Sequence, residues 1–494
     1  MTPSNRLKLN LVLIAVLVFY WLLDQAIPDA VTPYDDIVLS ASTPITPLSP
    51  DLKQLTTDAE GIRKITQAHP GQTSVIPLAT DNASQIATRL LIAQATQKVD
   101  LILSEWRIDE ASTRLAATLL DATERGVKIR LTIDDRTLQF SDKTLFSLAR
   151  HPLISIRVFN PQHRVSNYAG IRLWDYFSGL KPQHQSLREQ SIMVDDLLAI
   201  QGGIDGDGNA VARDFLIAGV ALNSMRKHFD QVWQHPLSKD IGEVFPEHPF
   251  ILHNLSPRDK KINVIYQTIQ GYARTRLSLS DNQNFALNSS NLAEKINGNW
   301  THSTYLHSDM AHEQIDLRLL ELIQDARSSI QLQIPAPNFP SSIRQALAAA
   351  RQRGVHITLL CDSMTSNKSA AEFVHYRNQR KSLIAQGIHI REFKANFQAE
   401  SSGISRNTQV MLIDHNTLYT GHFPLFSDAK NSPPASAFII KEPLTVKKMS
   451  DALEHNFSSQ QVWNPQTDKP DQEASFWRKC AYLFLRWWQV FREQ

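Results

Sequence analysis

The chain has 494 residues, more than one ordinary hydrophobic core accommodates, and this length predicts two domains of roughly 200 residues each. Its 51 Lys and Arg residues nearly balance 49 Asp and Glu residues, and the sequence has no run of five or six basic residues. This charge pattern argues against a nucleic-acid-binding protein. The two cysteines, Cys361 and Cys480, lie far apart, which excludes a disulfide framework and a cysteine-based zinc site.

The N-terminal segment is predicted to be a membrane anchor. Arg6 and Lys8 precede residues 9–23, which carry no charge and would form a helix about 22 Å long. This is a little short of the ~30 Å thickness of a hydrocarbon core, but the flank at residues 25–27 could extend it. A cleaved signal peptide and a buried helix are alternatives, but the absence of a clear small-residue cleavage site favours an uncleaved anchor over residues 1–27. Positive charge before the segment and acidic charge after it predict a cytoplasmic N-terminus, with the body of the protein across the membrane.

Residues 28–67 follow the anchor and are rich in Pro, Ser, Thr and Asp. Their apolar residues show little periodicity, so this segment is predicted to be a linker.

Two long segments of the chain resemble each other. Residues 89–135 and residues 318–363 each contain an amphipathic helix, an apolar strand, a second helix, and an Arg-Gly-Val sequence that opens a strand ending in Asp. Gly126 and Gly354 lie where the second helix stops, a usual position for a residue with positive φ. The alternation of helices and strands predicts two mixed, mostly parallel sheets flanked by helices.

A second matched pair of motifs supports this internal repeat. Residues 187–203 and residues 405–422 both read as a hairpin, in which Asp195 and Asp414 are each followed seven residues later by a glycine. The chain is therefore predicted to be a tandem duplication. Its predicted parts are a first half at residues 68–236, a connection at 237–310 and a second half at 311–465.

The order and spacing of these motifs resemble the phospholipase D superfamily and, within it, the bacterial cardiolipin synthases. Members carry in each half the signature His-x-Lys-x4-Asp, then six further residues, and then Gly-Gly or Gly-Ser. The resemblance implies a duplicated fold with a pseudo-twofold axis and chemistry that needs no metal or cofactor. One His attacks the phosphodiester, the other protonates the leaving alkoxide, and the two Lys hold the phosphate oxygens.

This chain departs from the signature in both halves. The residues at the His, Lys and Asp positions are Arg188, Gln190 and Asp195 in the first half, and Asn407, Gln409 and Asp414 in the second. An Arg side chain stays protonated and an Asn carboxamide is no general acid, so neither replaces a catalytic imidazole. The resemblance therefore predicts a pseudoenzyme that retains a phospholipid-binding or partner-binding cleft.

Several residues have two open interpretations. Arg188 either binds a phosphate or pairs with a buried carboxylate such as Asp214, which matches a supporting acid of the family whose second-half counterpart falls near Ala435. His422 either substitutes for a catalytic His or forms a hydrogen bond at a strand end. The two signature aspartates also suit hairpin turns, because Asp favours turns by bonding nearby backbone amides.

The C-terminal residues 474–494 are predicted to form an amphipathic helix. Its basic residues lie on one arc, opposite an arc of Phe, Trp and Leu side chains, a pattern typical of a helix in the headgroup layer of a membrane. The alternative is a terminal helix that packs on the protein's own core.

Three functions remain open from the sequence. The first is a pseudoenzyme in the bacterial inner membrane, with a periplasmic body that binds anionic phospholipid, a membrane surface or a protein partner. The second is an active phosphatidyltransferase or phosphodiesterase that uses a non-standard His. The third is a structural or assembly protein of the membrane. A nuclease is disfavoured because a net charge of +2 offers little to a polyanion.

Overall fold

The computed structural model describes residues 52–78, 81–104, 110–134, 148–149, 151–161, 187, 189–202, 214–244, 296–308, 313–367, 370–397, 409–421, 423, 435–476, 478–480, 482–483 and 485–486. The expected anchor at residues 1–27 lies outside these ranges, as do Arg188, Asn407 and His422. Among the helices of the described ranges, none is both long and apolar enough to span a membrane.

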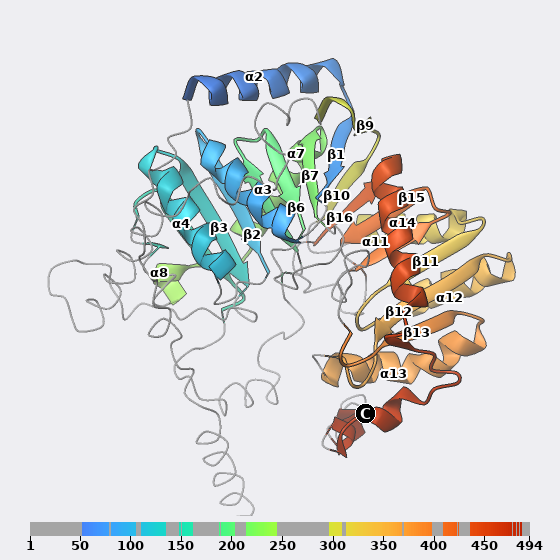
Figure 1. Cartoon of the computed structure of the whole chain (residues 1–494). Helices are drawn as coiled ribbons and strands as arrows, with labels where there is room; N and C mark the ends of the chain where they lie inside the picture. The colour runs from blue at the N-terminus through green and yellow to red at the C-terminus, as the bar shows by residue number, and fades with distance from the viewer. Residues whose placement is uncertain are drawn as a thin grey trace, which may run out of the picture.

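The first half of the chain builds one mixed sheet, seen in the left part of Figure 1. Its nine strands lie in the order β8-β4-β3-β2-β5-β6-β7-β1-β9. Their bounds are β1 Thr73–Pro77, β2 Lys98–Leu103, β3 Lys128–Asp134, β4 Ile154–Phe159, β5 Gln190–Val194, β6 Leu198–Gln201, β7 Phe215–Gly219, β8 Ser238–Asp240 and β9 Trp300–Thr301.

The second half builds a second mixed sheet, in the order β10-β16-β15-β14-β11-β12-β13-β17. Its bounds are β10 Thr304–Ser308, β11 Ser329–Gln333, β12 His356–Asp362, β13 His389–Phe393, β14 Val410–Ile413, β15 Thr417–Gly421, β16 Ala435–Ile440 and β17 Val462–Trp463. Strand β8 and strand β10 both fall inside the segment expected to be a connection, so the sheets extend further into it than the sequence suggested.

The two sheets share one topology. Starting from β1, the first sheet runs β1-β7-β6-β5-β2-β3-β4-β8, and starting from β10, the second runs β10-β16-β15-β14-β11-β12-β13-β17. Each strand of the first series has the same rank in chain order as its counterpart in the second. The internal duplication expected from the sequence is thus present strand by strand.

The prediction that the sheets are mostly parallel is wrong. Within the described strands, the parallel pairs are β2–β3, β3–β4, β11–β12 and β12–β13. The signature strands pair antiparallel with their neighbours, as in β2–β5, β5–β6, β6–β7 and their counterparts. Only strands joined by a helical crossover can run parallel, whereas the signature hairpins connect through short turns that force antiparallel pairing.

Helices cover both faces of each sheet. Their bounds are α2 Leu52–Ala68, α3 Asp81–Gln94, α4 Glu110–Glu124, α7 Ala221–Gln234 and α8 Ile241–Val244, then α11 Glu313–Asp325, α12 Ser341–Gln352, α13 Ala370–Ala385 and α14 Pro443–Ser458. Helix α2 occupies residues expected to be a linker. Its Ile62 is buried and its Ile65 packs on the first core, which stabilises a helix that the weak periodicity did not predict.

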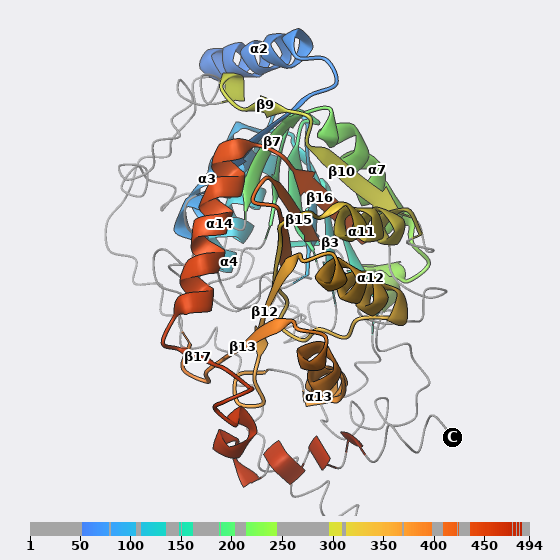
Figure 2. The same ribbon diagram turned by 90° about the vertical axis from the view of Figure 1, so that its right-hand side faces the viewer.

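The described residues form three hydrophobic cores. One core lies between the first sheet and helices α3 and α4, and a matching core lies in the second half against α11, α12 and α13. The third core combines residues of both halves, such as Met225 and Phe229 on α7 with Tyr305, Phe438 and Leu453 of the second half. Figures 1 and 2 show β10 and β16 next to α7 at this junction. The inner faces of the two halves therefore form one continuous interior.

Candidate functional site at the interface of the two halves

The signature aspartate of the first half ties its hairpin to the start of a neighbouring strand. The Asp195 carboxylate accepts hydrogen bonds from the backbone N–H groups of Thr96, Gln97 and Lys98, at 2.8, 2.8 and 2.9 Å. The Thr96 hydroxyl donates a fourth bond at 2.9 Å. These bonds fix the β5–β6 hairpin on the entry to β2.

The second half repeats this arrangement. The Asp414 carboxylate accepts from the N–H groups of Arg327, Ser328 and Ser329, at 2.9, 2.7 and 2.9 Å, and from the Ser328 hydroxyl at 2.8 Å. Partial burial alone would raise the pKa of Asp414, but the hydrogen bonds from the three consecutive N–H groups outweigh it and lower that pKa below its ordinary value. Each signature aspartate thus binds the backbone at the start of a strand, β2 after α3 or β11 after α11.

Both hairpins turn through left-handed backbone. Asp195 and Asp196 have φ values of 53° and 53°, and Asp414 and His415 have φ values of 50° and 54°. Asp tolerates this region better than most residues. The His415 ring contacts the Ser450 hydroxyl on α14 through Nδ1 at 3.0 Å, so this ring lies against α14.

The signature glycines are required by close packing at the ends of the hairpins. The N–H of Gly202 donates to the carbonyl of Gln190 at 2.9 Å. A Cβ atom at Gly202 would lie 2.1 Å from Oδ1 of Asp214, and its φ of 130° also disfavours a side chain. The buried Asp214 therefore lies beside the signature strand of the first half.

The corresponding packing in the second half corrects one prediction. A Cβ atom at Gly421 would lie 2.7 Å from the Cα of Ala437, just as one at Gly202 would lie 2.8 Å from the Cα of Asp214. The counterpart of Asp214 is therefore Ala437 and not Ala435, because the register of β15 with β16 is two residues further along than the sequence comparison suggested. The second half has no carboxylate at this position.

A buried acid at the end of β3 holds the chain next to Arg188. Asp134 is fully buried, and its Oδ2 accepts a hydrogen bond from the N–H of Leu187 at 2.5 Å. Its counterpart Asp362, at the end of β12, accepts from the Ser366 hydroxyl at 3.1 Å. The Asp predicted to end each of these strands is thus present, and in the first half it positions the residue that precedes the signature.

A polar cluster crosses the interface between the halves. The Glu189 carboxylate contacts Nε2 of His228 on α7 and accepts a hydrogen bond from the Ser436 hydroxyl on β16. Tyr305 on β10 completes the cluster, with its ring centroid 6.3 Å from that of His228. Glu189 and His228 come from the first half and Ser436 and Tyr305 from the second, so this cluster joins the two halves through polar contacts.

Burial makes the cluster a structural element and limits its chemistry. The exposed fraction is 1% for the His228 side chain and 11% for Glu189. Burial raises the pKa of Tyr305 well above its ordinary value, and the negative charge of Glu189 raises it further. The His228 imidazole is engaged by Glu189 and closed off from solvent, so it is not placed to attack a lipid phosphate.

The cluster also links the first signature to the strand that packs on the second. Glu189 lies between the His and Lys positions of the first half, and Ser436 precedes Ala437, which packs against the signature glycine of the second half. Gln190 is buried at the start of β5, whereas Gln409 is half-buried just before β14. The described parts of both signatures therefore approach the same interface.

Sequence reasoning missed all four cluster residues. His228 lies on the apolar face of α7 and Ser436 and Tyr305 lie within strands, so each is typical of an ordinary core position. Glu189 carried one usable signal, since it is an acid next to a signature strand. No local pattern shows that residues 39 and 247 positions away would meet it.

Comparison with known proteins supports the resemblance seen in the motifs. A family model described as "Cardiolipin synthase, PLD-like domain" matches residues 319–458. Cardiolipin synthase C of Escherichia coli is 24% identical over 400 residues, which cover 74% of this chain and 80% of that protein. An uncharacterized protein of Helicobacter pylori is 20% identical over 414 residues, covering 76% of this chain and 77% of its own.

The fold agrees with these sequence relatives. The crystal structure of a phosphatidylserine synthase of Haemophilus influenzae matches with a TM-score of 0.50 at 12% identity, over 87% of this chain and 99% of that one. One assignment agrees with the matched strands, the signature aspartates and the family model. Residues 319–458 match the PLD-like domain family of the cardiolipin synthases, and the chain as a whole is similar to the cardiolipin synthase-like branch of the phospholipase D superfamily.

Proposed function

We propose that this protein is a pseudoenzyme of the cardiolipin synthase type, which binds a phospholipid headgroup in the cleft between its halves without transferring the phosphatidyl group. The observation that carries the proposal is the contrast between framework and chemistry at the signatures. Asp195 and Asp414 make the same set of backbone hydrogen bonds in both halves. The positions of the catalytic His and Lys hold Arg188, Gln190, Asn407 and Gln409.

The replaced residues remove each chemical step of the family's reaction. Phosphoryl transfer without a metal needs a nucleophile, a general acid and fixed positive charge on the phosphate oxygens. Two glutamines and an asparagine supply neutral hydrogen bonds only. Arg188 retains one positive charge, in a planar fork suited to a phosphate.

Two imidazoles near the signatures are engaged elsewhere. His228 is buried against Glu189, and His415 contacts α14. The second-half site also has Ala437 where the first half has Asp214. A site that has lost its nucleophile, both lysines and one supporting acid favours binding over turnover.

The relatives support a phospholipid as the ligand. The matched proteins include a cardiolipin synthase and a phosphatidylserine synthase, both of which act on phospholipids. An anionic glycerophospholipid such as phosphatidylglycerol is therefore the proposed ligand, with Arg188 as its phosphate contact. A protein partner or a purely structural role would leave this lipid unbound.

We also propose that residues 1–27 anchor the protein in the bacterial inner membrane and that the body is periplasmic. The proposal rests on the uncharged segment and on the charges that flank it. Protease added to intact spheroplasts should digest the body, whereas protection in spheroplasts and digestion in inverted vesicles would reverse the orientation.

Calorimetric titration of the full chain in detergent with a short-chain phosphatidylglycerol tests headgroup binding. Because this lipid is monomeric, it reports the cleft and not attachment to a bilayer. Arg188→Gln should weaken binding about tenfold, the effect of losing one charge-assisted contact. The control Arg318→Gln changes a surface Arg that pairs with Glu321 and should leave binding unchanged. Equal affinity of both variants, or no binding by the unchanged protein, would contradict the proposal.

A further inference from the structure

The C-terminal segment is helical at its described residues 476, 478–480, 482–483 and 485–486, called here the C-terminal helix. Its polar side attaches it to the second half. One guanidinium nitrogen of Arg478, Nη1, donates to the carbonyl oxygens of Met364, Thr365 and Asn367, at 2.8, 2.6 and 3.4 Å. One turn further on, Tyr482 packs on the second core beside Phe373. Arg478 and Tyr482 are four residues apart, so they define the protein-facing side of the helix.

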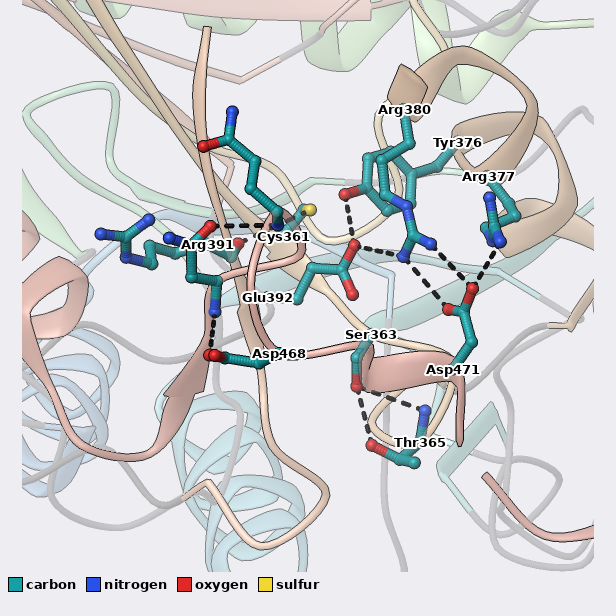
Figure 3. Close-up of polar contacts among 12 residues, drawn as sticks. Cys361, Ser363, Thr365, Tyr376, Arg377, Arg380, Arg391, Glu392, Asp468 and Asp471 are labelled. Atoms are coloured by element: carbon teal, nitrogen blue, oxygen red, sulfur yellow. Dashed lines mark hydrogen bonds and ion pairs between the residues drawn. The ribbon is translucent and has the colours of Figure 1, made fainter. Parts of the chain in front are cut away.

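An ion-pair cluster immediately before the helix fixes its origin. The Asp471 carboxylate pairs with Arg377 at 2.6 Å and with Arg380 at 2.7 Å (Figure 3). Arg380 also pairs with the buried Glu392 at 2.9 Å, and Tyr376 donates a hydrogen bond to the same carboxylate at 2.6 Å. Asp471 belongs to the 3-10 helix Pro470–Glu473, so the cluster clamps the chain to α13 and β13 just before the C-terminal helix starts.

The opposite side of the helix presents large apolar side chains to the outside. Phe476 is 70% exposed and Leu483 is 60% exposed. Seven residues are almost two helical turns, so these two side chains share one face, away from Arg478 and Tyr482. A terminal helix that served only to cover the core would show the reverse orientation, with its apolar arc turned inward.

The charges beside this face are cationic. Arg486 is exposed, and Lys479 lies at the edge of the same face with Nζ on the carbonyl of Gln472. The sequence from residue 474 to residue 492 contains four basic residues and no Asp or Glu. An apolar face flanked by cations matches the boundary of an anionic bilayer, where apolar side chains enter the acyl region and Arg and Lys meet headgroups.

We propose that the C-terminal helix is a second membrane contact, held by the Asp471 clamp so that Phe476 and Leu483 enter an anionic lipid surface while Arg478 and Tyr482 stay on the protein. In Figures 1 and 2 this segment lies beyond α13, at the end of the molecule opposite α2. The contact therefore fixes the second half, and with it the interface site, relative to the bilayer. It does not depend on lipid binding in the cleft.

The native cysteines allow a direct test. Cys361 is fully buried, whereas Cys480 lies on the helix and is partly exposed, so a thiol-reactive fluorophore on the folded protein labels Cys480. The full chain is reconstituted in phosphatidylcholine vesicles with or without phosphatidylglycerol. Quenching of the label by doxyl lipid in the phosphatidylglycerol vesicles is expected, with little quenching in phosphatidylcholine alone.

Matched variants separate insertion from general effects on hydrophobicity. The pair Phe476→Asp and Leu483→Asp should lower the partitioning of the label into the bilayer about tenfold or more. The control pair Leu317→Asp and Leu444→Asp changes side chains of similar exposure, 59% and 60%, on α11 and α14 and should have no effect. Arg486→Gln should reduce the preference for anionic vesicles.

Two outcomes would overturn the proposal. A label that remains accessible to an aqueous quencher in both kinds of vesicle would show that the helix does not enter lipid. Equal quenching in the Phe476→Asp, Leu483→Asp variant and in the control variant would show that the apolar face is not the contact. Arg188→Gln serves as a cross-check, because a failure of headgroup binding in the cleft leaves the Cys480 signal unchanged.

Discussion

The Glu189 carboxylate accepts a hydrogen bond from the Ser436 hydroxyl across the interface of the two halves, while its other oxygen contacts the buried imidazole of His228. This bond joins the chain next to one signature to the strand that packs on the other. It adds a buried polar connection to the apolar core that the two halves share.

Removing this connection should destabilise the association of the halves. Glu189→Ala leaves His228 and Ser436 buried without their partner and should cost about 2–4 kcal/mol, whereas Ser436→Ala should cost about 1–2 kcal/mol. Urea unfolding of the two single variants and the double variant measures the coupling between them. The exposed Glu454→Gln on α14 is the control and should change stability by less than about 0.5 kcal/mol. Strictly additive effects of the two substitutions would contradict a direct interaction.

The signature aspartates Asp195 and Asp414 should stabilise the fold in both halves. Asp195→Ala and Asp414→Ala each leave three backbone N–H groups without their acceptor and should cost about 2–3 kcal/mol. Because the pKa of Asp414 is lowered in the folded state, its contribution is present above about pH 4 and is lost as the pH falls below that value. Unfolding curves at pH 7 and pH 3 test this, with the exposed Asp451→Asn as control. An Asp414→Ala penalty that is the same at both values of pH would contradict stabilisation by hydrogen bonds to the ionised carboxylate.

The signature glycines should not tolerate even a methyl group. Gly202→Ala and Gly421→Ala each place a Cβ within 2.5 Å of a neighbouring atom, at φ values of 130° and 120°, and should cost roughly 3 kcal/mol. Gly126→Ala is a matched control, because its φ is 89° but nothing lies within 4 Å of the added Cβ. It should cost only about 1 kcal/mol of backbone strain. Thermal unfolding that ranks Gly126→Ala equal to the other two would refute the packing argument.

Asp316 on α11 should make stability fall between mildly acidic and neutral pH. Burial raises the pKa of this carboxyl group from 3.8 to about 6. The folded state therefore binds its proton more tightly than the unfolded chain, so the contribution is complete below about pH 4 and is lost as the pH rises through 6. Asp316→Asn should stabilise the protein by roughly 1 kcal/mol at pH 8 after allowance for solvent screening, and have little effect at pH 4. The exposed Asp325→Asn on the same helix should show no such difference, and equal curves for both would exclude the effect.

The duplication was predictable because local sequence patterns repeat in the two halves. A helix, a glycine with positive φ, a strand ending in Asp and an Asp-bearing hairpin recur in the same order, and Gly126 and Gly354 have φ values of 89° and 90° in the structure. The direction of the strands was not predictable in the same way. A helix between two strands indicates that they run parallel. The apolar pattern of a strand does not show which strand lies beside it, so the antiparallel pairing of β5 with β2 and of β14 with β11 could not be read from the sequence.

The polar cluster and the orientation of the C-terminal helix depended on tertiary contacts. A buried His on α7 and a Ser on β16 look like ordinary core residues until the two halves are placed together. The helical projection grouped Arg478 with the cations expected to meet anionic headgroups, whereas in the structure its guanidinium donates to the carbonyls of residues 364, 365 and 367. Helix α2 was missed because its stability comes from a few contacts such as Ile62 with the first core.

Turnover of phosphatidylglycerol is the most direct test of the central claim, which is that the superfamily framework remains without its catalytic groups. The purified full chain is incubated with labelled phosphatidylglycerol in vesicles, and cardiolipin is measured by chromatography alongside His422→Ala. We predict no cardiolipin above the level of a protein-free control for either protein. Cardiolipin that rises in proportion to the unchanged protein and disappears with His422→Ala would contradict the account and establish an active transferase.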